Sequence, residues 1–144
     1  MATPIGLKIG LAIFDILSDD SALLAITGMS AAKIQPAPLK DESKTDVAVV
    51  YEFNAINPVN VKRVYRTETA PLHIVDFTCD CIAKDYSTSV SMAQSVTEAL
   101  ETAINNTYNG VKIRGITLEG ATELYNKQRR YYNKSVSFQA RVLL

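Results

Sequence analysis

The chain is poor in the residues on which catalysis most often depends. It contains one histidine, His73, and two cysteines, Cys79 and Cys81. A serine or cysteine nucleophile needs a neighbouring base, usually a histidine, and the lone histidine lies inside an alternating strand pattern. The sequence has neither a G-x-S-x-G elbow nor a glycine-rich phosphate-binding loop. We therefore expect no catalytic residues, no cofactor and no enzymatic activity.

The two cysteines do not fit a disulfide framework or a zinc site. Their i, i+2 spacing places both thiols on one face of a strand, together with His73. Zinc sites usually combine a C-x-x-C pair with a second ligand pair, and no fourth ligand accompanies these three residues. Asp76 and Asp80 share the opposite face, which we interpret as a solvated sheet face rather than an acid–base pair. We expect two thiols buried as small hydrophobic side chains and no metal.

The chain also has no net charge and no long apolar run. Its 144 residues carry 15 basic and 15 acidic side chains, so it lacks the basic excess that is typical of nucleic-acid binders. Near-zero net charge is compatible with packing against copies of itself. The longest apolar segment, residues 5–17, is interrupted by Lys8 and Asp15. We expect no membrane helix, no signal peptide and synthesis in the cytosol.

Hydrophobic residues make up 47% of the chain, which is ordinary for a globular protein. A length of 144 residues matches the commonest domain size and leaves little room for a second core. We expect one domain spanning residues 1–144.

Two segments show helical periodicity, and a short third helix is expected between them. The first covers residues 5–17. Ser18 or Asp19 is placed to cap a short helix that ends before Gly28. The segment 87–105, capped by Ser87 or Ser89, has the clearest apolar stripe. The stripe consists of Val90, Ala93, Val96, Leu100, Ala103 and Ile104.

Strand patterns fill much of the remaining sequence. They cover residues 47–56, 59–69, 72–83, 111–118 and 135–144, with an edge strand or extended loop at 33–39. Asn57-Pro58 is predicted to form a turn and the polar run 40–46 a mobile loop. The order favours an α+β fold, in which an antiparallel-rich mixed sheet packs against a long helix and an N-terminal helical segment.

Residues 125–134, YNKQRRYYNK, mix four cations with three tyrosines. Basic residues interleaved with aromatics can bind single-stranded nucleic acid. Tyrosine and arginine are also favoured at protein interfaces. A protein interface is favoured over nucleic acid because the net charge is zero, and a plain surface loop remains an equal alternative.

The order of segments resembles the small tail terminator, or tail-completion, proteins of tailed bacteriophages. An N-terminal helix is followed by a short Asp-containing segment, IFDILSDDSALLAITG. A proline-containing strand, KIQPAPL, precedes an apolar strand, VAVVYEF. A strand then runs directly into a helix in FTCDCIAKDYSTSVSMAQSVTEAL, and the chain finishes with VSFQARVLL.

The resemblance implies a homohexameric ring that caps the completed tail tube and offers a surface for joining the head. The implied partners are other copies of the chain, the tail tube protein and a head-completion or connector protein. DNA would at most pass through the lumen, and the protein would be assembled in the host cytoplasm and reside in the tail or neck of the virion. Candidate interface residues are Lys40, Asp41, Glu42, Lys44, Lys62, Arg63, Arg66, Arg129, Arg130 and Tyr131.

Three alternatives stay open at this point. The first is another neck or tail component, such as a head-completion protein or a tail tube subunit. The second is a small nucleic-acid-binding module that uses residues 125–134. The third is an enzyme that borrows residues from a neighbouring subunit.

Overall fold

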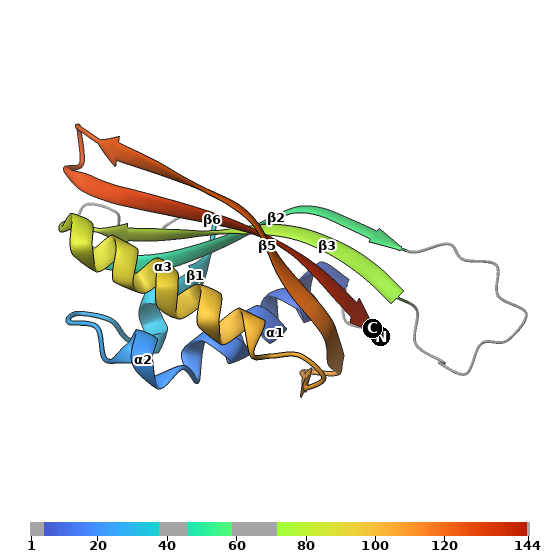
Figure 1. Ribbon diagram of the computed structural model, residues 1–144. Helices are drawn as coiled ribbons and strands as arrows, with labels where there is room; N and C mark the ends of the chain where they lie inside the picture. Colours follow the sequence, from blue (N-terminus) through green and yellow to red (C-terminus); the bar gives the residue numbers. More distant parts are fainter. Residues whose placement is uncertain (1–4, 38–45, 59–71, 144) are drawn as a thin grey trace, which may run out of the picture.

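A mixed β-sheet runs the length of the protein, and its helices lie against one face (Figure 1). The computed structural model describes residues 5–37, 46–58 and 72–143, with the side chains of residues 5–7 not described. The helices are α1 (Ile5–Ser18), α2 (Ser21–Leu24) and α3 (Tyr86–Glu101), with a 3-10 turn η1 (Ala31–Lys33). The strands are β1 (Ile34–Pro36), β2 (Val47–Pro58), β3 (Leu72–Ala83), β4 (Thr107–Tyr108), β5 (Val111–Asn126) and β6 (Tyr131–Leu143). The predicted α+β class is confirmed.

The six described strands follow the order β1-β2-β3-β6-β5-β4. β1 runs parallel to β2, and every other neighbouring pair is antiparallel. β1 therefore forms one edge of the sheet, as the two prolines of segment 33–39 predicted. The predicted strand at 59–69 and loop at 40–46 lie mainly outside the described residues.

β3 begins and ends where the alternating pattern predicted. His73, Cys79 and the other odd-numbered residues of this strand are buried on the helix-covered face. The alternation of β2 differs from the prediction. A regular strand over residues 47–56 would place Phe53 and Ala55 on one face, but the register shifts between them, and Ala55 pairs with Asp76 of the polar face. The strand also continues through Pro58, which pairs with His73, so the predicted turn at Asn57-Pro58 is wrong.

The helix caps differ from the predicted ones. The carboxylate of Asp85 accepts a hydrogen bond from the Thr88 N–H and caps α3, where Ser87 or Ser89 was predicted. Asp20 caps α2 in the same way, in place of Ser18 or Asp19. An Asp carboxylate at this position accepts from the first free N–H groups and also carries the charge that a helix N-terminus favours.

The end of α3 also corrects the predicted stripe. The helix stops at Glu101, so Ile104 lies beyond it and is 44% exposed. Met92, which was not assigned to the stripe, is fully buried between α3 and the sheet. The core is centred on Phe77 of β3 and Phe138 of β6, whose rings stack with centroids 5.4 Å apart.

The connection between β4 and β5 is a two-residue turn at Asn109-Gly110. Both residues have positive φ, 50° and 79°, which is the backbone that the twist of a tight hairpin requires. β5 then extends eight residues beyond its predicted end. Register shifts adjoin Gly115 and Gly120, as expected for glycines that mark bulges.

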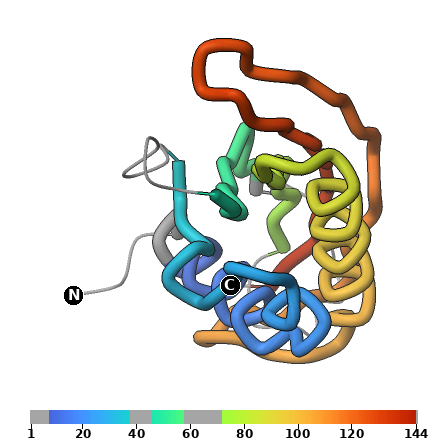
Figure 2. Tube along the Cα trace, turned by 90° about the vertical axis from the view of Figure 1, so that its left-hand side faces the viewer, coloured from blue at the N-terminus to red at the C-terminus, as the bar shows by residue number. Residues whose placement is uncertain are grey.

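Figure 2 shows the helices gathered on one side of the sheet. No helix within the described ranges is both long and apolar enough to cross a membrane. The opposite face is polar, and its side chains bond across the strands. Gln139 donates to Asp76, and Ser135 donates to Asp80. This confirms that the two aspartates lie together on a polar sheet face.

Candidate interaction surface

The longest run of exposed residues in the described structure lies in the β5 half of the β5–β6 hairpin. We call residues 120–137 the hairpin arm. In Figure 1 the arm lies at the upper left, above the N-terminal end of α3. Residues 117–125 of β5 are all exposed, so neither face of this stretch is covered by a helix. The segment predicted as an interface or loop, 125–134, forms the end of this hairpin.

The turn of the hairpin arm is held by Asn126. Its side-chain oxygen accepts the N–H groups of Gln128 and Arg129 at 3.1 and 3.0 Å, and its carbonyl accepts the Arg130 N–H at 2.7 Å. Arg130 has a φ of 57°, which closes the four-residue loop back onto β6. Lys84, just before α3, donates to the Arg129 carbonyl at 3.0 Å. The turn is therefore an ordered element fixed to the body of the protein.

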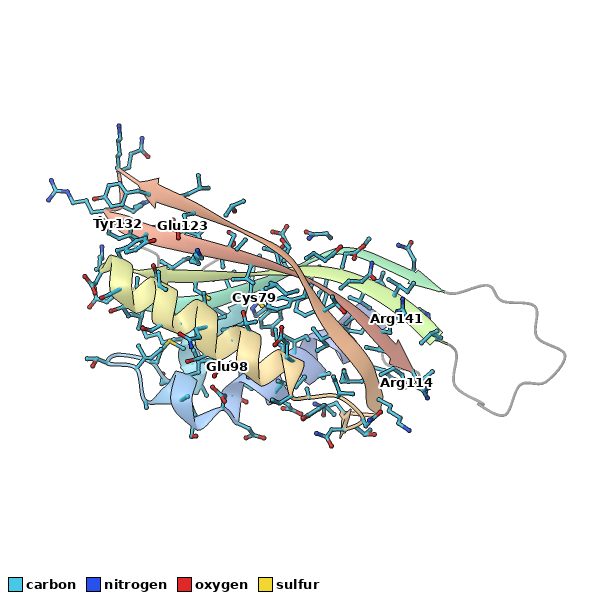
Figure 3. The ribbon with its side chains drawn as sticks, viewed as in Figure 1. Cys79, Glu98, Arg114, Glu123, Tyr132 and Arg141 are labelled. Atoms are coloured by element: carbon cyan, nitrogen blue, oxygen red, sulfur yellow. The ribbon has the colours of Figure 1, made fainter. Side chains whose placement is uncertain are left out.

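A cluster of three tyrosines joins the hairpin arm to the first turn of α3. Tyr132 packs edge-on against Tyr86 at 5.5 Å and against Tyr125 at 4.7 Å between ring centroids. Together with Leu124 and nearby polar groups, the rings line a shallow cleft of about 220 Å³. Figure 3 shows Tyr132 and Glu123 at this end of the sheet, far from Arg114 and Arg141 at the other end.

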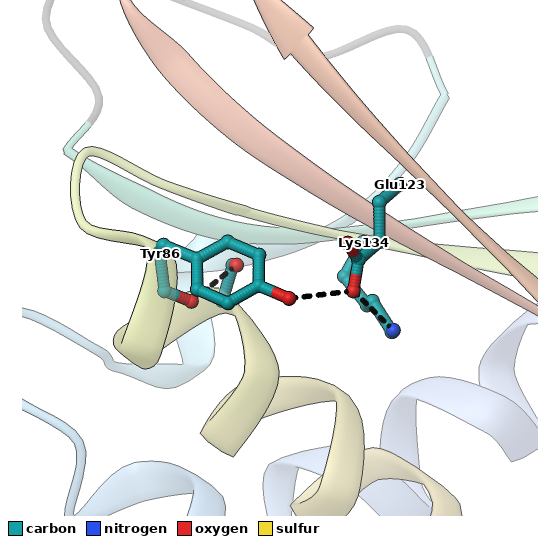
Figure 4. Close-up of polar contacts among 4 residues, drawn as sticks. Tyr86, Glu123 and Lys134 are labelled. Carbon is teal, nitrogen blue, oxygen red and sulfur yellow. Dashed lines mark hydrogen bonds and ion pairs between the residues drawn. The ribbon is translucent and has the colours of Figure 1, made fainter.

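The polar contacts of this cluster centre on Glu123 (Figure 4). Its Oε1 accepts the Tyr86 hydroxyl at 2.9 Å and the Lys134 ammonium at 2.6 Å. The bond from Lys134 and then that from Tyr86 hold the pKa of Glu123 below its usual range. The pKa values of Lys134 and Tyr86 are raised, in each case chiefly by the hydrogen bond to Glu123. The charged carboxylate thus links the arm to the helix.

Three predicted interface residues lie in this region. Arg129 and Arg130 form the exposed turn, and Tyr131 begins β6, where it pairs with Asn126. The other seven, from Lys40 to Lys44 and from Lys62 to Arg66, lie outside the described residues. Sequence reasoning missed Tyr86, Glu123 and Leu124. The available signal for a continued strand was the β-propensity of Thr122 and Tyr125.

The two cysteines behave as core residues. Cys79 and Cys81 are free and fully buried. Burial is the main cause that raises the pKa of each thiol, and the neighbouring Asp80 adds to it. The described part of the chain holds no group of three or more histidine, cysteine or acidic residues that could bind a metal ion. The predicted thiol burial is confirmed.

The outer edge of β5 is open along most of its length. β4 pairs only with Val111 and Lys112, and Asn105 and Asn106 bond with Ile113. Beyond that point no described strand pairs with β5 on this side. The bulges near Gly115 and Gly120 interrupt the edge, but residues 120–126 are regular. An unpaired edge is a template for contact with another chain.

Comparisons with known proteins identify the fold. No family model and no curated protein sequence matches the chain. A chain from the virion of a native gene transfer agent (GTA) particle matches with a TM-score of 0.71 and 14% identity. The match covers 99% of this chain and 100% of that one. A second solved structure matches with a TM-score of 0.53 and 17% identity, covering 99% of this chain and 98% of its own.

Proposed function

We propose that this protein is a structural virion component whose identical subunits form a ring that caps the end of a tail tube. The observation that carries the proposal is the fold match to a chain of the GTA virion. The match is reciprocal and covers nearly all of both chains, so the whole fold is shared and not a single motif. The tail and neck position, the hexameric ring and a head-joining surface follow from the sequence resemblance to tail terminator proteins and belong to the proposal.

The form of the molecule is suited to contact with copies of itself. The sheet has two different open edges in its described part, at β5 on one side and along β2 beyond the short β1 on the other. A contact between two different surfaces of the same chain is heterologous, and it closes into a ring when the rotation per subunit divides a full turn. The hairpin arm provides an ordered, exposed surface for such a contact.

The test combines sedimentation with electron microscopy. The purified protein, alone and mixed with the tail tube protein of the same virus, is expected to form closed rings that bind tube ends and stop tube growth. Monomers at high concentration under both conditions would refute the proposal. Long filaments of this protein alone would identify a tube subunit, and binding to a connector without binding to tubes would identify a head-completion protein.

Nucleic-acid binding is the alternative of a different class. The hairpin arm carries basic residues beside tyrosines, which is the composition of a single-strand binding surface. Titration with oligonucleotides at increasing salt separates the two functions, because phosphate binding weakens steeply with salt. The ring proposal expects no binding at physiological ionic strength.

A further inference from the structure

The described charges are separated between two parts of the molecule. The hairpin arm carries four cations, Lys127, Arg129, Arg130 and Lys134, and one carboxylate, Glu123. The segment from α1 to the end of α2 carries three aspartates and a single cation, Lys8. The charged residues of α3 are both acidic, Glu98 and Glu101. A chain with no net charge therefore has a basic arm and an acidic helical layer.

The acidic residues of α3 lie at the less favourable end of the helix. Glu98 and Glu101 are exposed in its last turn, and no basic residue lies there. A helix C-terminus carries partial negative charge and favours cations. Within the described residues the carboxylate of Glu98 accepts only from the side-chain amide of Gln94, and the carboxylate of Glu101 has no partner. The two carboxylates therefore do not stabilise their own helix, because they are repelled by the partial negative charge at its C-terminus. A cation from another chain would relieve this repulsion.

The basic turn of the same chain is too far away to supply that cation. Lys84 bonds to the turn of the hairpin arm, and Tyr86 packs against the arm, so the arm lies at the start of α3. The 16 residues of α3 place its last turn about 20 Å or more away at 1.5 Å per residue. In Figure 3 the arm lies at the upper left, and Glu98, in the last turn of α3, lies well below and to the right of it. Only a second molecule can bring the two together.

Exposed apolar side chains accompany both charged surfaces. Leu124 and Tyr125 of the hairpin arm are 66% and 47% exposed. Ile104, three residues after the end of α3, is 44% exposed. Interfaces combine such apolar contacts with arginine and tyrosine at their centre. The arm and the acidic helix end are therefore complementary in both charge and apolar character.

We propose that the hairpin arm of one copy docks on the C-terminal end of α3 of the next copy, where Lys127 and Arg130 face Glu98 and Glu101. The inference rests on the proposed ring function and names the contact that builds the ring. Because the two surfaces differ and lie apart on the same molecule, the contact is heterologous and leads from copy to copy around the ring.

The experiment uses two variants with reversed charges on the full chain. The arm variant is Lys127→Glu with Arg130→Glu, and the helix variant is Glu98→Lys with Glu101→Lys. All four side chains are exposed, so both variants are expected to fold. We expect each variant to lose about 10-fold or more in self-association constant, measured by sedimentation equilibrium at low ionic strength.

Mixing the two variants is the decisive measurement. The acidic arm of one variant matches the basic helix end of the other, and the basic arm of the second matches the acidic helix end of the first. The equimolar mixture is therefore expected to recover the association of the unmodified protein. An isologous contact that involves only one of the two surfaces would leave one of the two variants associating normally on its own, and such a result would overturn the inference.

Two controls separate this contact from folding and from the ring function itself. Lys33→Glu, on η1 next to the opposite edge of the sheet, reverses one charge away from both surfaces and is expected to associate normally. The helix variant is expected to unfold at the same or a higher temperature, because its new lysines favour the helix C-terminus. If the unmodified protein forms rings and both variants form them equally well, the inference fails and the ring function stands. If the unmodified protein never associates, the ring function fails as well.

Discussion

The buried thiols of β3 provide a direct test of the core. Cys79 and Cys81 are both 0% exposed. Burial is the main cause that raises the pKa of each thiol above its ordinary value. A thiol reagent attacks the thiolate, so labelling requires the thiol both to reach solvent and to lose its proton. In the folded protein neither requirement is met until β3 opens and exposes the thiols to solvent.

The free energy needed to open a central strand determines how much slower the thiols are labelled in the folded protein. β3 is paired on both sides, to β2 and to β6, so exposing its thiols requires most of the sheet to separate. Native domains are stable by about 5–15 kcal/mol, and each 1.36 kcal/mol is a factor of ten. Even at the lower limit, native labelling is slowed by about 10³- to 10⁴-fold relative to the unfolded chain.

The assay compares the rate of reaction with an aromatic disulfide reagent in native buffer and in concentrated urea. We expect two thiols to react at once in urea and essentially none on that timescale in the folded protein. A second readout is the pair of variants Cys79→Ala and Cys79→Ser. A buried hydroxyl without a partner costs about 1–3 kcal/mol, so the serine variant should be the less stable of the two.

Rapid labelling of either thiol in the folded protein would refute this reasoning. It would mean that β3 is exposed or opens at little cost, and the sheet described above would then be wrong at its centre. A serine variant more stable than the alanine variant would also contradict it, because that result requires a hydrogen-bond partner beside Cys79.

Four further predictions concern stability and titration. The pKa of both thiols is raised in the folded protein, so above about pH 9 the folded protein keeps protons that the unfolded chain releases. The free energy of unfolding should therefore be unaffected by these thiols below about pH 9. Above that pH it should fall by up to about 1.4 kcal/mol per pH unit per thiol, as measured by urea titration. Gly110→Ala, at a φ of 79° with open space around it, should cost about 1–2 kcal/mol by the same measurement, from backbone strain alone. Phe138→Ala removes a fully buried ring stacked on Phe77 and should lower the free energy of unfolding by about 3–5 kcal/mol. A much smaller loss would mean that this ring is not buried in the core. Glu123→Gln should lower the pKa of Tyr86, followed by tyrosine absorbance, and an unchanged pKa would exclude the bond between them.

Half-buried elements were the part of the fold that the sequence predicted best. β3 alternates buried and half-buried residues along most of its length, so its boundaries could be read from the pattern. α3 has one buried face, and only its ends were misplaced. The cap of α3 was predicted at Ser87 or Ser89. In the structure the cap is Asp85, whose carboxylate accepts hydrogen bonds from both Ser87 and Thr88. These bonds lower the pKa of Asp85.

The candidate surface was predicted less well for a related reason. Residues 117–125 are exposed on both faces of β5, so no alternation between core and solvent marks them as a strand. The strand is defined by its pairing with β6, for example Tyr125 with Tyr132, and such long-range pairs cannot be read from local periodicity. The basic and aromatic composition of residues 125–134 still indicated an interface, although it gave no sign of a hairpin.

The order of the hairpin arm is itself an argument for its role in binding. The β5 side of the arm is exposed and leaves Leu124 in solvent, whereas its β6 strand pairs with β3 along residues 132–137. Two hydrogen bonds also fix the arm to the start of α3. Lys84 donates to a carbonyl of its turn, and the Tyr86 hydroxyl donates to Glu123. Together with the pairing to β3, these surface bonds hold the arm in one orientation before any partner arrives. A surface ordered in advance binds without the entropic cost of ordering a loop. The arm therefore has the properties expected of the preformed subunit contact proposed above.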